Sequence, residues 1–188
     1  MTKHSLEETA QALVAKGKGI LAADETGPTI STHSLARAEE VTAEVLERVF
    51  HALYTQRVAL EGMLLKPNMV VPGKESPERA PVAAVATATL RVLRRHVPSA
   101  VPGIVFLSGG QSDEVATANL DAINRLPGSR PWPLSFSYGR ALQAPAQKAW
   151  RGDPTRIAAG QQALYSQARL NAAARRGAYA PEMERAVA

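Results

Sequence analysis

The chain has 188 residues, of which 45% are hydrophobic, and carries a formal net charge of +5 at pH 7. This length and composition indicate one globular domain with its own core and exclude a disordered chain. The chain contains no cysteine, which excludes disulfides, thiolate metal sites and cysteine nucleophiles.

The N-terminus lacks the apolar core and cleavage site of a signal peptide, and no apolar run approaches the roughly 18 residues of a membrane span. We therefore expect a cytoplasmic protein without a membrane partner. The arginines are spread along the chain, and aromatic residues, at 5%, are not interleaved with them. This pattern argues against a nucleic-acid partner, whereas a modest positive charge suits small phosphorylated substrates.

Short apolar runs alternate with longer amphipathic ones, as is typical of a parallel α/β sheet. In chain order, the predicted elements are a helix at 5–16, a buried strand at 19–23, a helix at 34–57, a buried strand at 60–65, a helix that Ser76 caps and that runs to about His96, a strand at 103–107, a helix from Ser112, a strand at 132–136, and helices at 141–150 and 153–177. There is no internal repeat and no linker, so a single domain over residues 1–188 is predicted.

Each of the four predicted strands ends in a polar or glycine-containing cluster. These clusters are Asp24, Lys66, Ser108-Gly109-Gly110 and Gly139-Arg140. In parallel α/β folds the C-terminal ends of the strands form the active-site face. We therefore expect the four clusters to form one site.

Lys66 carries the chemical prediction. A lysine at the mouth of a buried strand is poorly solvated as an ammonium, and the neutral amine favoured there attacks carbonyls to form a Schiff base. The alternative is a lysine that caps the strand and extends its ammonium into water. Asp24 is either its carboxylate partner in proton transfer or a cap for the following turn.

The other two clusters suggest a phosphate site. The glycines at Gly109 and Gly110 let the backbone approach an anion, although a purely structural turn is the alternative. Arg140 suits bidentate phosphate contacts, although a single arginine is more often a surface charge. The four histidines lack metal-ligand spacing, so no metal site is predicted.

Four blocks resemble the class I fructose-bisphosphate aldolases, and the resemblance runs through nearly the whole chain. The blocks are GKGILAADETG at 17–27, LEGMLLKPNMV at 60–70, FLSGGQS at 106–112 and SFSYGRALQ at 135–143. The second block is very specific. The resemblance implies a (β/α)8 barrel of the TIM type that cleaves fructose 1,6-bisphosphate to dihydroxyacetone phosphate and glyceraldehyde 3-phosphate, a step of glycolysis.

By the same resemblance, Lys66 is the Schiff-base lysine and Asp24 the aspartate that ends the first strand. Ser108, Gly109, Gly139 and Arg140 match positions that hold a phosphate of the sugar substrate. No metal or other cofactor is implied, because the iminium itself is the electron sink.

The chain departs from that family in its length. A complete barrel needs about 250 residues. By the same resemblance, residues 27–33 are the junction at which the family's segment for strands two to five is missing. The resemblance thus implies an incomplete barrel, a half barrel of about four parallel strands with surrounding helices. The family's lysine on strand four and paired glutamates on strand five have no counterpart.

Two expectations follow from the half barrel. Its exposed sheet edges and apolar inner face favour a homo-oligomer. The missing acid–base groups leave open an alternative function, that of a non-catalytic protein that binds sugar phosphates or a partner.

Overall fold

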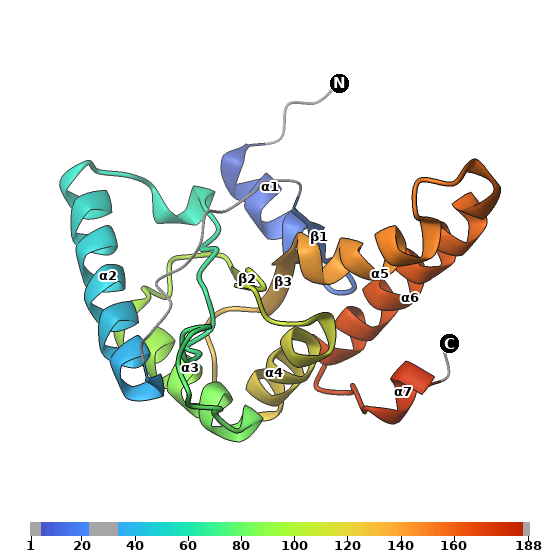
Figure 1. Cartoon of the computed structure of the whole chain (residues 1–188). Helices are drawn as coiled ribbons and strands as arrows, with labels where there is room; N and C mark the ends of the chain where they lie inside the picture. Colours follow the sequence, from blue (N-terminus) through green and yellow to red (C-terminus); the bar gives the residue numbers. More distant parts are fainter. Residues whose placement is uncertain (1–4, 23–33, 186–188) are drawn as a thin grey trace.

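The computed structural model describes residues 5–22 and 34–185 (Figure 1). In chain order its elements are α1 (Leu6–Leu13), β1 (Ile20–Leu21), α2 (Leu35–Thr55), the 3₁₀ turn η1 (Leu60–Gly62), α3 (Val82–His96), β2 (Ile104–Phe106), α4 (Asp113–Arg125), β3 (Leu134–Tyr138), α5 (Arg140–Trp150), the 3₁₀ turn η2 (Pro154–Arg156), α6 (Ile157–Ala174) and α7 (Glu182–Arg185).

The sheet is parallel, and its strands do not follow chain order. β3 lies between β1 and β2, and Leu65 continues the sheet beyond β2 through a parallel bridge to Ile104. The spatial order is therefore β1, β3, β2 and the Leu65 segment. A barrel that retains only its first, sixth, seventh and eighth strands has this same order, so the predicted contiguous half barrel is confirmed.

The second predicted strand is largely wrong. Residues 60–62 form η1 instead, and pairing with β2 is limited to the stretch around Leu65 and Pro67. Hydrogen bonds join the Leu65 N–H to the Gly103 carbonyl (3.2 Å) and the Leu107 N–H to the Pro67 carbonyl (3.1 Å). Within the described residues, the segment around Leu65 pairs with β2 alone and is therefore the edge of the sheet. It is stabilised only where its backbone meets that of β2, so the strand is short.

Prolines explain two further boundary errors. α3 begins at Val82 rather than beside Ser76, whose hydroxyl accepts a hydrogen bond from the Glu78 N–H and caps only a turn. A residue that precedes proline disfavours the helical region, so Pro81 marks the earliest start. β3 begins at Leu134 rather than at position 132 because Pro133 has no N–H to donate to the sheet.

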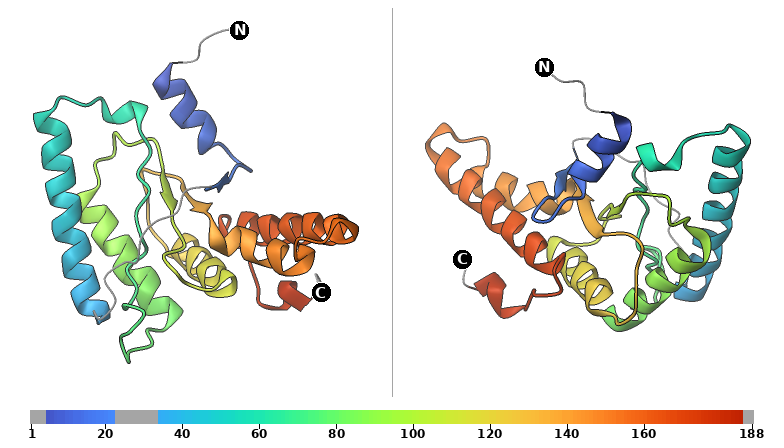
Figure 2. Two further views of the ribbon diagram at one scale, coloured as in Figure 1. Left: turned by 45° about the horizontal axis from the view of Figure 1, so that its top comes forward. Right: turned by 180° about the vertical axis from the view of Figure 1, so that it is seen from behind.

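Most other predicted helices are confirmed with ends shifted by a few residues. Ser34 caps α2 through the Arg37 N–H, and Ser112 caps α4 through the Val115 N–H. α2 and α3 lie together on one side of the sheet, whereas α5 packs along α6 and both extend away on the other side (Figure 2). A bidentate ion pair of Arg91 with Glu39, at 2.6 Å for each contact, joins α3 to α2.

The core surrounds the two longer strands. All five residues of β3 are buried, as are all three of β2, which indicates that helices or loops cover both faces there. Tyr138 is fully buried and donates its hydroxyl hydrogen to the Ala116 carbonyl at 2.9 Å. Within residues 5–22 and 34–185, none of the helices combines the length and apolar character needed to cross a bilayer.

Candidate functional site

Two of the predicted clusters follow the C-terminal ends of neighbouring parallel strands, β2 and β3. Phe106 of β2 lies opposite Phe136 of β3, and each strand leads into one of the clusters, β2 into the Ser108–Gly110 turn and β3 into Gly139-Arg140. β1 ends beside the end of β3, where the Ala22 N–H donates to the Tyr138 carbonyl at 2.9 Å. Ser108, Gly109, Gly139 and Arg140 therefore all lie just beyond the C-terminal ends of the neighbouring strands β2 and β3.

Lys66 lies in the adjacent segment. Because Leu65 pairs with Ile104, Lys66 is level with Val105, which comes three residues before Ser108 along the chain. Its neighbours Leu65 and Pro67 both bond to the backbone beside β2, which fixes its position. Lys66 is half-buried rather than deeply buried, because η1 and the edge segment leave one side of it open.

The turn after β2 contains two consecutive glycines with a left-handed backbone. Gly109 and Gly110 have φ of 57° and 76°, in the left-handed region that favours glycine. Ser108 is buried, and its carbonyl accepts hydrogen bonds from the backbone and side-chain N–H groups of Gln111 at 3.0 and 2.9 Å. Among the residues that the structure describes, the N–H groups of Gly109 and Gly110 have no hydrogen-bond partner.

The two neighbouring helices differ in how well they suit an anion. At α4, the Ser112 hydroxyl already accepts a hydrogen bond from the Val115 N–H, and Asp113 and Glu114 place negative charge in the first turn. At α5, the N-cap is Gly139, with no side-chain cap and no acidic residue in the first turn. The N-terminus of α5 is therefore the more favourable of the two for an anion, and the exposed Arg140 is its first residue.

Two residues that the sequence reasoning missed contact the glycine turn. A Cβ added at Gly109 would lie 2.9 Å from Cγ of Asn68, and one added at Gly110 would lie 2.7 Å from Nζ of Lys74. The Lys74 side chain therefore lies across the turn with its ammonium beside the backbone. The only sign of these two residues in the sequence is that both follow Lys66 within a few positions. Their contacts with the glycine turn are tertiary and leave no local pattern.

Asn68 also carries an unsatisfied polar atom. Its Oδ1 is buried and lacks a hydrogen-bond partner within the described part of the chain. A buried acceptor without a donor costs about 1–3 kcal/mol.

Asp24 lies outside the residues that the structure describes, so its role stays a prediction. Within residues 5–22 and 34–185, no group of three or more histidine or acidic side chains is arranged to hold a metal ion. The described part of the site consists of lysines, an arginine, serines and backbone N–H groups. Such a set suits a phosphorylated carbonyl compound.

Comparisons with known proteins agree with this chemistry. The family model described as fructose-bisphosphate aldolase class-I matches residues 30–188. Fructose-bisphosphate aldolase 2 of Caenorhabditis elegans is 55% identical over 150 residues, which cover 80% of this chain and 41% of the relative. A cytoplasmic isozyme 2 of fructose-bisphosphate aldolase from Pisum sativum is 43% identical over 184 residues, covering 95% of this chain and 51% of the relative.

A solved structure gives the same result for the fold. The fructose-bisphosphate aldolase of Plasmodium falciparum, crystallised in complex with TRAP and a small molecule inhibitor, superposes with a TM-score of 0.76 at 42% identity. The match covers 93% of this chain and 52% of that one. The fold is therefore an incomplete (β/α) barrel, and the chain spans about half the length of the relatives it matches.

Proposed function

This chain belongs to the class I fructose-bisphosphate aldolase family, and on that premise we propose that Lys66 forms a Schiff base with dihydroxyacetone phosphate or fructose 1,6-bisphosphate. The observation that supports the proposal is the parallel bridge of Leu65 with Ile104, since Lys66 then lies beside β2, the strand that leads into the Ser108–Gly110 turn. A short phosphorylated ketone fits between a reactive amine and an anion cradle arranged in this way.

The phosphate would be held by the backbone and by two flexible cations. We assign its contacts to Ser108, the N–H groups of Gly109 and Gly110, Gly139 at the start of α5, and Arg140. Lys74 adds a second positive charge beside the same turn. Charge-assisted hydrogen bonds to a phosphate contribute about 1.5–3 kcal/mol each, so a few of them are enough to position the substrate.

The covalent step requires only the amine and a proton source. Nζ of Lys66 adds to the ketone carbon, the carbinolamine loses water, and an iminium remains that accepts the electron pair of the bond to be cleaved. We assign Asp24 to proton transfer in this sequence. Residues 27–33 we assign to the join at which the segment for strands two to five is missing, within one domain that spans residues 1–188.

Borohydride trapping tests this proposal. Incubation with dihydroxyacetone phosphate followed by reduction is expected to leave a covalent adduct on Lys66, identified by peptide mass spectrometry. Lys66→Ala should abolish the adduct completely, whereas Lys148→Ala, at an exposed position on α5, should retain it. A folded wild-type protein without an adduct would refute the Schiff-base role.

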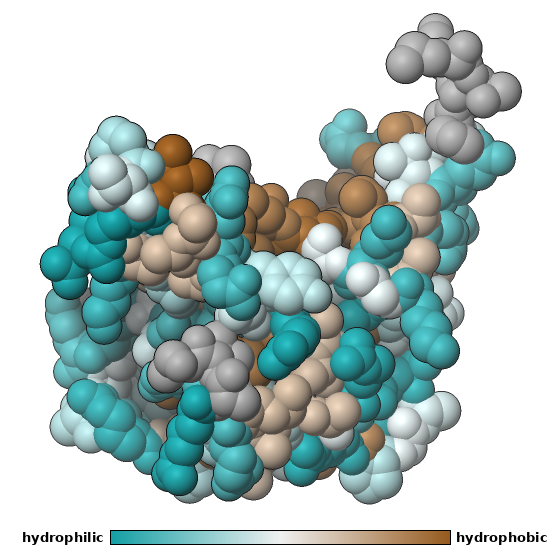
Figure 3. Space-filling view, turned by 90° about the vertical axis from the view of Figure 1, so that its right-hand side faces the viewer, coloured by the Kyte–Doolittle hydropathy of each residue, from teal (hydrophilic) through white to brown (hydrophobic). Residues whose placement is uncertain are grey.

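We further propose that two copies of the chain associate through their open sheet edges in the cytoplasm. Leu21 on the edge strand β1 is 48% exposed, and within the described residues β1 pairs on one side only. Figure 3 shows apolar residues gathered in a recess next to the N-terminal segment. The chain spans about half the length of its relatives, and a second copy of a half barrel would offer a further set of strands to the open edge.

Analytical ultracentrifugation tests this association. The wild-type chain is expected to sediment as a dimer at micromolar concentration. Leu21→Glu should shift it to a monomer because it places a charge on the edge strand. Val115→Glu, at a residue of α4 that is 46% exposed, is the matched control and should leave the dimer intact. A stable wild-type monomer would contradict the proposal.

A further inference from the structure

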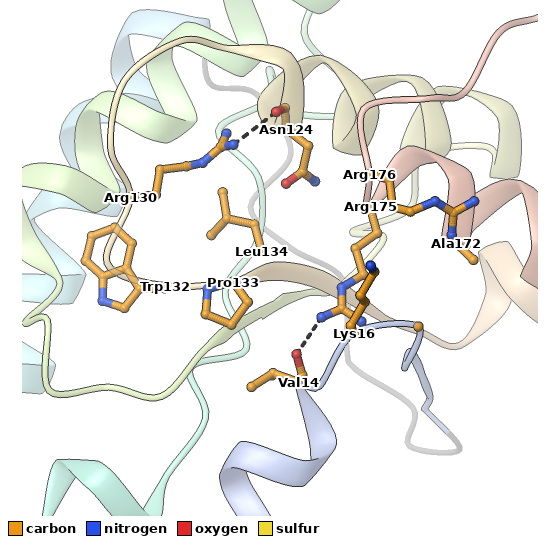
Figure 4. A pocket seen from close by; sticks show the side chains of 11 residues that line it. Val14, Lys16, Asn124, Arg130, Trp132, Pro133, Leu134, Ala172, Arg175 and Arg176 are labelled. Carbon is orange, nitrogen blue, oxygen red and sulfur yellow. Dashed lines mark hydrogen bonds between the residues drawn. The ribbon is translucent and has the colours of Figure 1, made fainter.

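A separate cavity lies beside the start of β3 (Figure 4). Its volume is about 380 Å³, and it opens between the turn after α1, the start of β3 and the C-terminal end of α6. Trp132, Pro133 and Leu134 form an apolar wall. No described residue of the candidate active site is among those that line this cavity, so the two sites are distinct.

The cavity is lined by four cations and by no carboxylate. The cations are Lys16, Arg130, Arg175 and Arg176. Each helix C-terminus contributes about half a negative charge, and α1, α4 and α6 end at this cavity. Four full positive charges exceed the charge of three helix ends, so the cavity remains net positive.

Two of the arginines are fixed in place by backbone carbonyls. Arg175 donates hydrogen bonds to the carbonyls of Val14, Ala15 and Lys18, and Arg130 donates to those of Ile123 and Asn124. A guanidinium has five N–H groups. These contacts therefore leave N–H groups on both arginines for a ligand, in positions that need no reordering.

The positive charges of Arg175 and Arg130 are incompletely stabilised, because both side chains are partly buried and each is repelled by a neighbouring arginine. Burial, and then the neighbouring Arg176, lower the pKa of Arg175. Burial, and then Arg94, lower the pKa of Arg130. The hydrogen bonds to backbone carbonyls account for the presence of Arg175 and Arg130 only. They do not account for Lys16 and Arg176, which are exposed on the rim of the same cavity. A bound anion would relieve the repulsion and would bring a negative charge to the exposed Lys16 and Arg176 as well.

We propose that this cavity is a second anion site, which binds a small phosphate ester or pyrophosphate independently of the Lys66 site. The phosphate groups would contact Arg175, Arg176 and Lys16, and the body of an organic ligand would pack on the wall formed by Trp132 and Pro133. The volume limits the ligand to the size of a small metabolite. The site is accessible from solvent and needs no turnover at Lys66.

Calorimetric titration with inorganic pyrophosphate at low salt, in an Arg140→Ala background, tests the proposal apart from the Lys66 site. One binding event is expected to remain in this background. Adding Lys16→Gln and Arg176→Gln should weaken it on the order of tenfold for each cation removed, because each loses a charge-assisted hydrogen bond. Raising the salt concentration should weaken it further.

The matched control is Arg169→Gln, at an exposed position on α6 outside the cavity, which should leave the affinity unchanged. Circular dichroism confirms that each variant is folded. Absence of binding in the Arg140→Ala background would overturn the proposal, as would equal affinity with and without Lys16 and Arg176. Neither result bears on the Schiff base, which the borohydride experiment tests by itself.

Discussion

Fructose 1,6-bisphosphate cleavage by this chain is expected to be about 10⁴-fold slower than cleavage by a full-length relative. The family resemblance places proton transfer on a lysine of strand four and glutamates of strand five, and neither has a counterpart here. General acid–base groups each contribute about 10²–10⁴-fold, so losing even two of these three groups at the lower bound gives this estimate. Trapping at Lys66 needs fewer proton transfers and should be far less affected.

A coupled assay for triose phosphate release, run beside a full-length class I aldolase at equal concentration, measures the ratio. Lys66→Ala provides the blank, since it removes any rate that depends on the Schiff base. A rate within tenfold of the full-length enzyme would contradict the expectation and would require that another residue has replaced the lost acid–base groups. An adduct without measurable cleavage would instead favour the sugar-phosphate-binding function.

Phe106→Ala is expected to lower the free energy of unfolding by about 3–5 kcal/mol. Phe106 is fully buried in β2, between β3 and the Leu65 segment. Domains of this size are stable by only about 5–15 kcal/mol, and a half barrel with open edges is expected to lie near the lower limit. The variant should therefore be largely unfolded at physiological temperature.

Urea denaturation followed by circular dichroism measures this change. Tyr165→Ala removes another aromatic ring, at a position of α6 that is 65% exposed, and should change the free energy of unfolding by no more than about 0.5 kcal/mol. If Phe106→Ala were equally mild, β2 would not be the centre of a packed core. The order of the strands would then be in doubt.

The sequence by itself determined those secondary-structure elements that have strong local signals. The recurrence of apolar residues predicted α2, and the serines before α2 and α4 marked where those helices begin. The block around Lys66 was specific enough to predict the family, and with it the order of the strands. Local patterns failed where prolines shifted the ends of α3 and β3, because backbone geometry there overrides hydrophobic periodicity.

Only the tertiary structure decided how the site is assembled. It placed Asn68 and Lys74 against the glycine turn, since contacts between segments leave no local pattern in the sequence. It also showed that the first turn of α5 is better suited to an anion than that of α4. The N-cap of α5 is Gly139, with no side-chain cap and no acidic residue in the first turn, whereas α4 has both. The residues that carry the chemistry are thus specified locally, whereas their burial and their distances depend on which strands lie side by side. For an incomplete barrel with an edge at Leu65, that arrangement leaves Lys66 half-buried instead of enclosed.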